Sequence, residues 1–266
     1  MKRKTHILVL VGLVLSASSC APATRMTASS QNEAWEALSP IDLTPANIIK
    51  RVDEVKSPQG DYTIVVDVTS YAGNRQPKSA TYEVMIKGGD NTIIKTIKPQ
   101  NERGRILLMK EHNLWAFFPE VTKPLRLSMQ ERLIGEVSNG DIARANFSGD
   151  YDARLLRSEK IGGKQYDVLE LKAKTPEVTY GTVILWAEQG TFSPLKAAFY
   201  AISGKLLKTC SYERYQTLGE RSRPTELVME DPLVKGKKSV ITYSSVKMGE
   251  IPEKYFTKDY MKKLMQ

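Results

Sequence analysis

Few residues of this 266-residue chain have a type and setting suited to chemistry, and Cys20 is the first of them. It follows the small residues Ser16–Ser19, an apolar run from Ile7 to Leu15 and a basic start at Lys2–Lys4. This order of charge, apolar core and small residues is typical of a secretory signal. The nine apolar residues are too few to span a bilayer as a helix of the mature protein. The sequence therefore predicts an exported chain with a thiol at its processing site.

The position of Cys20 resembles that of the lipidated cysteine in bacterial lipoprotein signals. On this interpretation, residues 1–19 are a signal peptide and Cys20 carries the lipid that anchors the chain to a membrane. Residues 20–40 are small, polar and unpatterned, which indicates a flexible tether. Residues 41–266 then form the folded domain.

The residues around Cys20 also bear on localisation. Ala21 is not the aspartate that is associated with retention in the inner membrane, so the resemblance favours an outer-membrane lipoprotein that faces the periplasm. The alternative is a conventional signal cleaved near Ala21 or Ala23, which gives a soluble periplasmic protein. Both interpretations place the protein in the cell envelope.

The remainder of the chain contains no catalytic or metal-binding pattern. His112 is the one histidine beyond the signal segment, and there is neither a Gly-x-Ser-x-Gly elbow nor a pair of metal-ligand motifs. The Gly162–Lys164 segment lacks the upstream glycine of a phosphate loop, and Asp150–Asp152 lacks the glycine and glutamate of a calcium loop. We therefore expect a protein that is not an enzyme and that needs no metal or cofactor.

The charge distribution argues against nucleic acid as a partner. The formal net charge is +9, but lysine and arginine are spread along the whole chain. Nucleic-acid-binding proteins usually concentrate such charge on one element. The pattern indicates a solvated outer face with a mild attraction for anionic lipid headgroups.

Cys210, in a strand-like segment, is left unpaired if Cys20 carries lipid, and is expected to be a buried thiol.

A helix is predicted soon after the tether. Pro45 suits the first helical position after Thr44, and apolar residues recur at helical spacing from Ile48 to Val55. The Ser57–Gly60 segment is expected to end this helix.

From Asp61 onward the apolar pattern changes to a period of two, with glycine- and asparagine-rich turns between the runs. Hairpin connections indicate one extensive antiparallel sheet of about eleven strands. The expected strands are Asp61–Thr69, Tyr82–Lys87, Arg105–Lys110, Asn113–Phe118, Pro124–Met129, Gln165–Lys174, Tyr180–Ala187, Leu195–Ser203, Lys205–Thr217, Thr225–Met229 and Ser239–Met248.

Two segments do not follow this pattern. Gln130–Arg157 mixes apolar residues with turn signals, and we expect short helices and loops that lie over one face of the sheet. Pro252–Met265 indicates a closing helical turn.

Two expected strands are apolar on both faces. In Val183–Ala187 and in Leu114–Phe118, successive side chains point to opposite faces and yet nearly all are hydrophobic. Such strands must be covered on both sides. A sheet that is fully packed by inserted helices explains this pattern, and so does a sheet curled around an apolar ligand.

In several segments, of which Leu114–Pro119 is the first, the chain resembles the LolA-like superfamily of bacterial outer-membrane lipoprotein-sorting proteins. The likeness covers residues from about 45 to 264. It is carried by the order and spacing of the following segments: Leu114–Pro119, Lys123–Leu127, Asn146–Tyr151, Val183–Trp186, Pro194–Lys196, Phe199–Tyr200, Gly204–Lys208 and Pro252–Thr257.

The resemblance implies a mainly β (α+β) fold, an unclosed antiparallel β-barrel of about eleven strands with helices plugging the concave face. It further implies an apolar cavity that accepts the acyl chains of lipoproteins or lipids without a cofactor. Together with a lipid anchor, this predicts a membrane-anchored carrier or acceptor whose partners are acylated lipoproteins or lipids, and an envelope transporter complex. The alternative is an envelope sensor or scaffold lipoprotein that acts through protein–protein contacts.

An acyl-binding wall requires aromatic and aliphatic side chains without directed polar groups. The candidates come from the predicted helix and from the doubly apolar strands, with Phe199 from a neighbouring strand. They are Ile48, Ile49, Val52, Trp115, Phe117, Leu185, Trp186 and Phe199.

Overall fold

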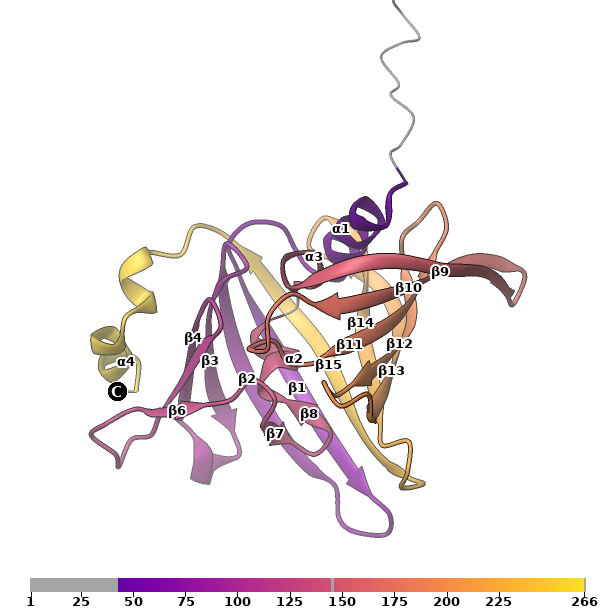
Figure 1. The fold of residues 1–266 in the computed structure, drawn as a ribbon. Helices are drawn as coiled ribbons and strands as arrows, with labels where there is room; N and C mark the ends of the chain where they lie inside the picture. Colours follow the sequence, from indigo (N-terminus) through magenta and orange to yellow (C-terminus); the bar gives the residue numbers. More distant parts are fainter. Residues whose placement is uncertain (1–42, 145, 266) are drawn as a thin grey trace, which may run out of the picture. The chain divides into compact units, whose positions relative to one another are not determined.

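Thirteen antiparallel strands form one continuous curved sheet in the computed structural model (Figure 1). The structure describes residues 43–144 and 146–265. The predicted signal peptide, the lipidated Cys20 and the tether lie outside these residues.

Strands that are neighbours in the sheet are also neighbours in the chain, with one exception. β1 pairs with β15, and this pairing joins the N-terminal strands to the C-terminal strands in one sheet. From one edge to the other they are β6 (Leu125–Leu127), β5 (Asn113–Phe117), β4 (Ile106–Lys110), β3 (Asn91–Lys98), β2 (Lys78–Lys87), β1 (Tyr62–Ala72), β15 (Lys237–Met248), β14 (Arg221–Glu230), β13 (Leu206–Leu218), β12 (Pro194–Tyr200), β11 (Thr182–Glu188), β10 (Lys164–Ala173) and β9 (Tyr151–Ile161). The edge strands β6 and β9 do not pair with each other, so the sheet is not closed into a barrel.

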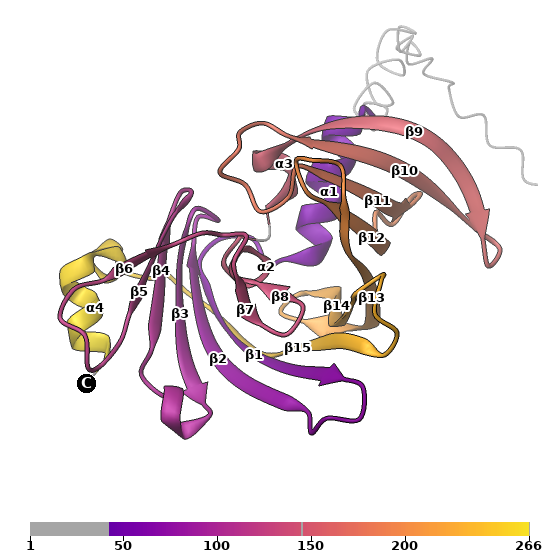
Figure 2. The same cartoon turned by 60° about the horizontal axis from the view of Figure 1, so that its bottom comes forward.

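The concave side of the sheet holds most of the inserted elements (Figure 2). These are α1 (Pro45–Lys56), the hairpin of β7 (Arg132–Ile134) and β8 (Val137–Ser138), α2 (Asn139–Ala143) and α3 (Phe147–Asp150). The turn η1 (Gln100–Glu102) joins β3 to β4. On the convex side, η2 (Glu253–Phe256) and α4 (Lys258–Leu264) lie against β3 and β4.

This architecture confirms the predicted fold, with thirteen strands in the sheet where about eleven were expected. The strands of this sheet that are absent from the prediction are β3 and β9. The first part of β9 falls in the Gln130–Arg157 segment, whose turn signals predicted short helices and loops. β9 is an edge strand, and its pairing with β10 outweighs its weak local pattern. The helix from Pro45 to Lys56 and the closing helical turn at the C-terminus lie where they were predicted.

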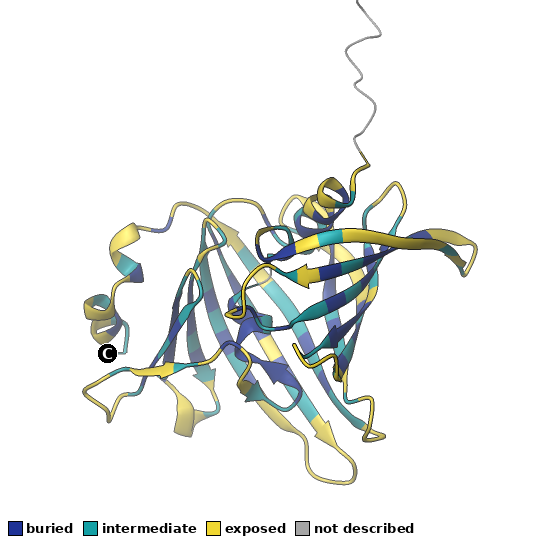
Figure 3. Ribbon diagram, in the orientation of Figure 1, coloured by how far each residue is buried: buried dark blue, intermediate teal, exposed yellow. Residues whose placement is uncertain are grey.

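The sheet separates two apolar clusters, visible as buried residues on both of its sides (Figure 3). The larger, concave cluster joins α1, α2 and α3 to the inner face of nearly every strand. It includes Cys210, which is buried as predicted. The smaller, convex cluster joins β3, β4 and β5 to η2 and α4. Among the described residues, no helix has the length and apolarity needed to cross a membrane.

Candidate functional site

Helix α1 covers the concave cluster with one apolar stripe. Ile48, Ile49 and Val52 recur at helical spacing and are all buried. The helix packs against α3, β9 and β14. Its amphipathic sequence therefore determines which of its faces meets the interior of the sheet.

The C-terminal end of α1 is held by an arginine from β14. The Nη1 atom of Arg223 donates hydrogen bonds to the carbonyl oxygens of Glu54 (2.6 Å), Val55 (3.0 Å) and Ser57 (2.6 Å). The last carbonyls of a helix lack donors within the helix, and a cation at this end is favoured by the helix dipole. Arg223 is buried, so it acts as an internal cap that ties α1 to the sheet.

The middle of α1 is tied to α3 by a buried carboxylate. Asp53 accepts hydrogen bonds from the backbone N–H groups of Phe147 (3.1 Å) and Ser148 (2.7 Å). The Nζ atom of Lys56 lies 3.7 Å from Asp53 Oδ1 and 3.4 Å from the centre of the Phe147 ring. Burial lowers the pKa of Lys56, and the neighbouring Asp53 carboxylate opposes this shift.

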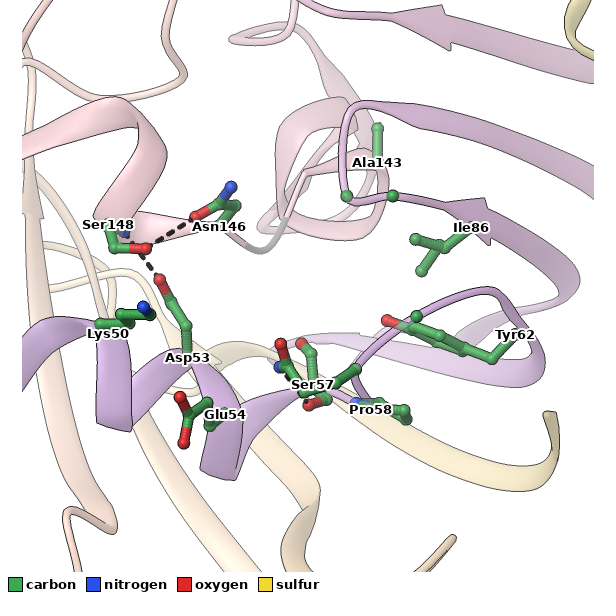
Figure 4. Close-up of a pocket in the computed structure, with 14 residues that line it drawn as sticks. Lys50, Asp53, Glu54, Ser57, Pro58, Tyr62, Ile86, Ala143, Asn146 and Ser148 are labelled. Carbon is green, nitrogen blue, oxygen red and sulfur yellow. Dashed lines mark hydrogen bonds between the residues drawn. The ribbon is translucent and has the colours of Figure 1, made fainter. Parts of the chain in front are cut away.

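A pocket of about 260 Å³ opens between α1 and the turn that follows β2 (Figure 4). Its wall is mixed in character, with the polar side chains of Lys50, Asp53 and Asn146 on one side and the apolar side chains of Tyr62 and Ile86 on the other. We call it the outer pocket.

Behind the outer pocket lies a cavity of about 50 Å³ with an apolar wall. Tyr62 and Ile86 line both spaces, so the two are neighbours. We call it the inner cavity. Its lining residues are Lys56, Ser57, Pro58, Tyr62, Ile64, Val66, Val84, Ile86, Asp141, Ile142, Tyr212, Leu218, Arg223, Pro224, Leu227 and Tyr243.

A third cavity, of about 60 Å³, continues inward beneath α2 and α3 and shares Tyr212, Leu227 and Tyr243 with the inner cavity. The polar side chains on one side of this cavity are hydrogen-bonded or ion-paired with one another. Asp141 accepts a hydrogen bond from the Tyr180 hydroxyl (2.6 Å) and forms a buried ion pair with Lys208. The three spaces thus lie next to one another in a path of neighbouring cavities from the surface beside α1 into the concave interior.

The tyrosines along this path are neutral. Burial raises the pKa of Tyr62 to about 12, and it also raises the pKa values of Tyr180, Tyr212 and Tyr243 well above the ordinary value. The inner cavity therefore offers mainly uncharged ring and aliphatic surface, an arrangement that suits an apolar ligand without directed polar groups.

Five of the eight predicted wall residues lie on the concave side. Ile48, Ile49, Val52, Leu185 and Phe199 are all buried in the concave cluster. Phe199 lines the third cavity, where its ring centre lies 4.5 Å from that of Tyr180. The other four belong to the packed core around the three spaces. Acyl binding by any of these residues stays a prediction.

Trp115 and Phe117 lie on the convex side, so the structure does not bring them to the cavities. Both belong to the convex cluster, where Lys258 Nζ lies 4.2 Å from the centre of the Trp115 ring. Phe117 also borders an open hollow of about 440 Å³ between the end of α4 and residues 119–122. β5 is apolar on both faces because Leu114 and Ala116 belong to the concave cluster, and its alternation directs the two aromatic rings into the convex cluster.

Trp186 also faces outward, because its neighbour Leu185 belongs to the concave cluster. The indole Nε1 donates to Glu159 Oε1 (2.6 Å), and Lys196 Nζ lies 4.6 Å from the centre of the ring. Trp186 with its charged neighbours shields the fully buried Val168 beside it. The amphipathic indole suits such a half-exposed position.

The residues that do line the inner cavity come largely from strands with strict alternation. Tyr62, Ile64 and Val66 of β1 were identified as one side of an alternating strand, but not as part of a site. The sequence signal that could have identified these lining residues was the alternation of β1, which begins directly after a helix with an apolar stripe. Val84, Tyr212, Leu227 and Tyr243 are brought beside them only by the sheet order.

Comparisons with known proteins agree with this geometry. A LolA superfamily protein from Nitrosomonas europaea is 44% identical, with a TM-score of 0.79 over 82% of this chain and 99% of that chain. A DUF1329 family protein from Desulfovibrio piger is 20% identical, with a TM-score of 0.70 over 82% of this chain and 97% of that one. A domain from Vibrio parahaemolyticus described as outer membrane lipoprotein-sorting is 19% identical, with a TM-score of 0.70 over 82% of this chain and 98% of that one.

A family model described as "Uncharacterized protein" matches residues 88–263. None of the curated proteins matches the chain significantly. The TM-scores show that these structures share the open antiparallel sheet of this chain, and they define one class of fold. Within that class, the chain belongs to the LolA superfamily.

Proposed function

We propose that this protein is an envelope carrier or acceptor that binds the acyl chains of lipoproteins or lipids beneath helix α1, and that Cys20 anchors it to the outer membrane. The observation that carries the proposal is the inner cavity, which lies next to the outer pocket and is lined mainly by apolar and aromatic residues of β1, β2, β13, β14 and β15, with Lys56, Asp141 and Arg223 at its wall. The LolA superfamily fold supports a carrier-like role.

Hydrophobic burial explains why such a protein is needed. Each CH₂ of an acyl chain exposed to water costs about 0.8 kcal/mol, so lipid crosses an aqueous compartment only inside an apolar wall. Van der Waals and hydrophobic contacts depend little on direction, so this wall holds a chain without fixing its chemical identity.

The size of the cavities implies that α1 moves when a ligand binds. A cavity of about 150 Å³ holds a benzene-sized molecule. The inner and third cavities measure about 50 and 60 Å³, so a longer acyl chain needs more room than they offer. The stripe of α1 and the apolar strands beneath it would then part and line the enlarged space.

The test is displacement of a fluorescent fatty acid by a lipopeptide. Leu218→Trp adds bulk at the mouth of the inner cavity, where Leu218 is only partly buried. We expect it to weaken probe binding about tenfold, since it blocks several methylene contacts while folding is retained. Ile184→Trp is the matched control, because Ile184 is partly exposed on the opposite face of the sheet.

Loss of binding in both variants, or in neither, contradicts a site beneath α1. If the parent protein binds no acyl probe at all, the sensor or scaffold interpretation replaces the carrier.

The anchor is tested separately by Cys20→Ser. Lipidation needs the thiol, so this variant is expected to leave the membrane fraction or to remain unprocessed. Membrane fractionation and the mass of the mature N-terminus measure this outcome. A variant that fractionates and is processed like the parent contradicts the lipid anchor and leaves the cavity proposal intact.

A further inference from the structure

Three neighbouring turns project from one end of the sheet. They are residues 73–77 between β1 and β2, residues 231–236 between β14 and β15, and residues 201–205 between β12 and β13. Register places them together, because β1, β15, β14 and β13 are consecutive neighbours in the sheet. Strands lie about 4.8 Å apart, so adjacent turns in this row are about 10 Å apart. Figure 1 shows the first two projecting at the lower end of the sheet.

These turns carry the most exposed large apolar side chains of the described residues. Leu233 is 75% exposed and Ile202 is 70% exposed, and Val234 and Leu207 are exposed beside them. The turn at Leu233 is well bonded, because the carboxylate of Asp231 accepts the backbone N–H groups of Leu233 (2.8 Å) and Val234 (3.2 Å). An ordered turn therefore holds two apolar side chains in solvent, an arrangement typical of a contact surface.

The same turns carry an excess of basic residues, with Arg75, Lys205 and Lys235 among them. Asp231 is the one acidic residue of the three turns, and it is paired with Lys237 (2.8 Å). We call the exposed apolar and basic residues of this end the basic rim. They are Arg75, Lys78, Ile202, Lys205, Leu207, Leu233, Val234 and Lys235.

We propose that the basic rim docks on the surface of an anionic lipid bilayer. Leu233, Val234 and Ile202 enter the headgroup layer, and the lysines around them pair with lipid phosphates. The apolar side chains at the tips of the turns match the apolar layer beneath the headgroups. The cations directly behind them match the anionic headgroups at the surface. The inference goes beyond acyl binding and does not depend on it.

Docking in this orientation has a consequence for the interior. A hollow of about 350 Å³ opens at the same end, lined by Ile202 and Leu207 at its margin and by Tyr180 and Lys208 deeper in. Tyr180 also lines the third cavity. A bilayer on the basic rim therefore faces a second opening toward the concave interior, away from the outer pocket.

The test is vesicle flotation of the chain from residue 20 onward with Cys20→Ser, which removes the predicted anchor and retains every described residue. The compact unit from Leu43 onward contains both apolar clusters, and the crystallised relative spans 82% of this chain. Vesicles of phosphatidylethanolamine with phosphatidylglycerol are compared with vesicles of phosphatidylcholine alone. We expect binding to the anionic vesicles that weakens as salt is raised.

Two sets of rim substitutions and one control set complete the experiment. Leu233→Ser with Val234→Ser is expected to weaken binding about tenfold through lost apolar insertion. Lys205→Gln with Lys235→Gln is expected to weaken it about fivefold for each charge removed. The control, Lys247→Gln with Met248→Ser, removes one charge and one apolar side chain at the opposite end of β15 and should change nothing. Met248 and Val234 are both 49% exposed, which makes this control a matched one.

Equal binding of parent and rim variants overturns the proposal, and so does absence of parent binding to anionic vesicles. The fatty-acid displacement assay, run on the same samples, keeps the two proposals separate. Rim variants that lose vesicle binding but still take up the probe support the rim, whereas loss of probe uptake alone affects only the cavity.

Discussion

The two faces of the sheet are each covered by a helix, but the helices are attached in different ways. On the concave side, α1 is held at its end by Arg223 and at its middle by Asp53, and cavities remain between its C-terminal half and the strands. On the convex side, η2 and α4 bury Phe256 and Met261 completely among the side chains of β3 and β4. Both covers bury apolar side chains, but the cavities beside the C-terminal half of α1 leave it less tightly packed, so it parts from the sheet more readily than η2 and α4 do.

The largest expected effect concerns the convex side. Phe256→Ala removes a fully buried ring and should lower the free energy of unfolding by about 3–5 kcal/mol, through lost burial and the cavity left behind. Chemical denaturation measures this loss, and the affinity of the folded fraction for a fatty-acid probe should stay unchanged. A loss of affinity without a loss of stability would show that the convex cluster is the ligand site.

The next effect concerns the attachment of α1. Arg223→Met leaves the terminal carbonyls of α1 without their donor, and we expect a loss of about 2–3 kcal/mol in stability with faster probe exchange. Arg221→Met is the control, since Arg221 lies on the same strand, is exposed and contacts Glu54 only at 3.8 Å. Stopped-flow fluorescence and denaturation of both variants test the comparison. Unchanged exchange in Arg223→Met contradicts the view that this residue holds α1 in place.

A smaller effect is expected at Trp186. Its ring is half-exposed on the convex side, so Trp186→Ala should cost about 1–2 kcal/mol, mainly by uncovering Val168. Probe affinity should not change, because Leu185 on the same strand faces the concave side instead. Denaturation and probe titration of one sample decide this. A specific loss of affinity would place Trp186 in the ligand wall after all.

The smallest expected effect is a dependence of the folding stability on pH, and it concerns Asp61. Burial of Asp61 tends to raise its pKa, but hydrogen bonds from Ile251, Lys87 and Gly88 outweigh burial and lower the pKa below its ordinary value of 3.8. The resulting stabilisation is complete at neutral pH and is lost as the pH falls from that value through the lower pKa of the folded state. Asp61→Asn should therefore flatten this part of the acid unfolding curve, which circular dichroism follows. An identical acid curve in the variant contradicts this role for Asp61.

The comparison of the two faces also shows which features of the structure could be predicted from the sequence. Alternation at Tyr62–Val66 and the apolar stripe of α1 predict which faces are buried, and these elements are present in the structure. Alternation cannot tell concave from convex, because both sides of an open sheet can be covered by helices. Trp115 and Trp186 were expected inside for that reason and lie outside, one beneath Lys258 and the other beneath Lys196.

The path of cavities depended on contacts that local sequence does not encode. Arg223 lies more than 160 positions from the helix end that it caps, and Asp53 lies 94 positions from Phe147 of α3, whose backbone it binds. Only the pairing of β1 with β15 brings the two halves of the chain together around α1. The superfamily resemblance supplied the overall arrangement, but the lining residues required the structure.

The central claim is that an acyl chain binds on the concave side beneath α1. The most direct measurement is amide NMR of the protein with a fatty acid that carries a nitroxide at its tail. We expect the amide signals of Ile64, Val84 and Leu227, which line the inner cavity, to broaden strongly. Those of Leu108 and Phe256 in the convex cluster should stay sharp. Broadening centred on the convex cluster, or none anywhere at saturating probe, would contradict the account.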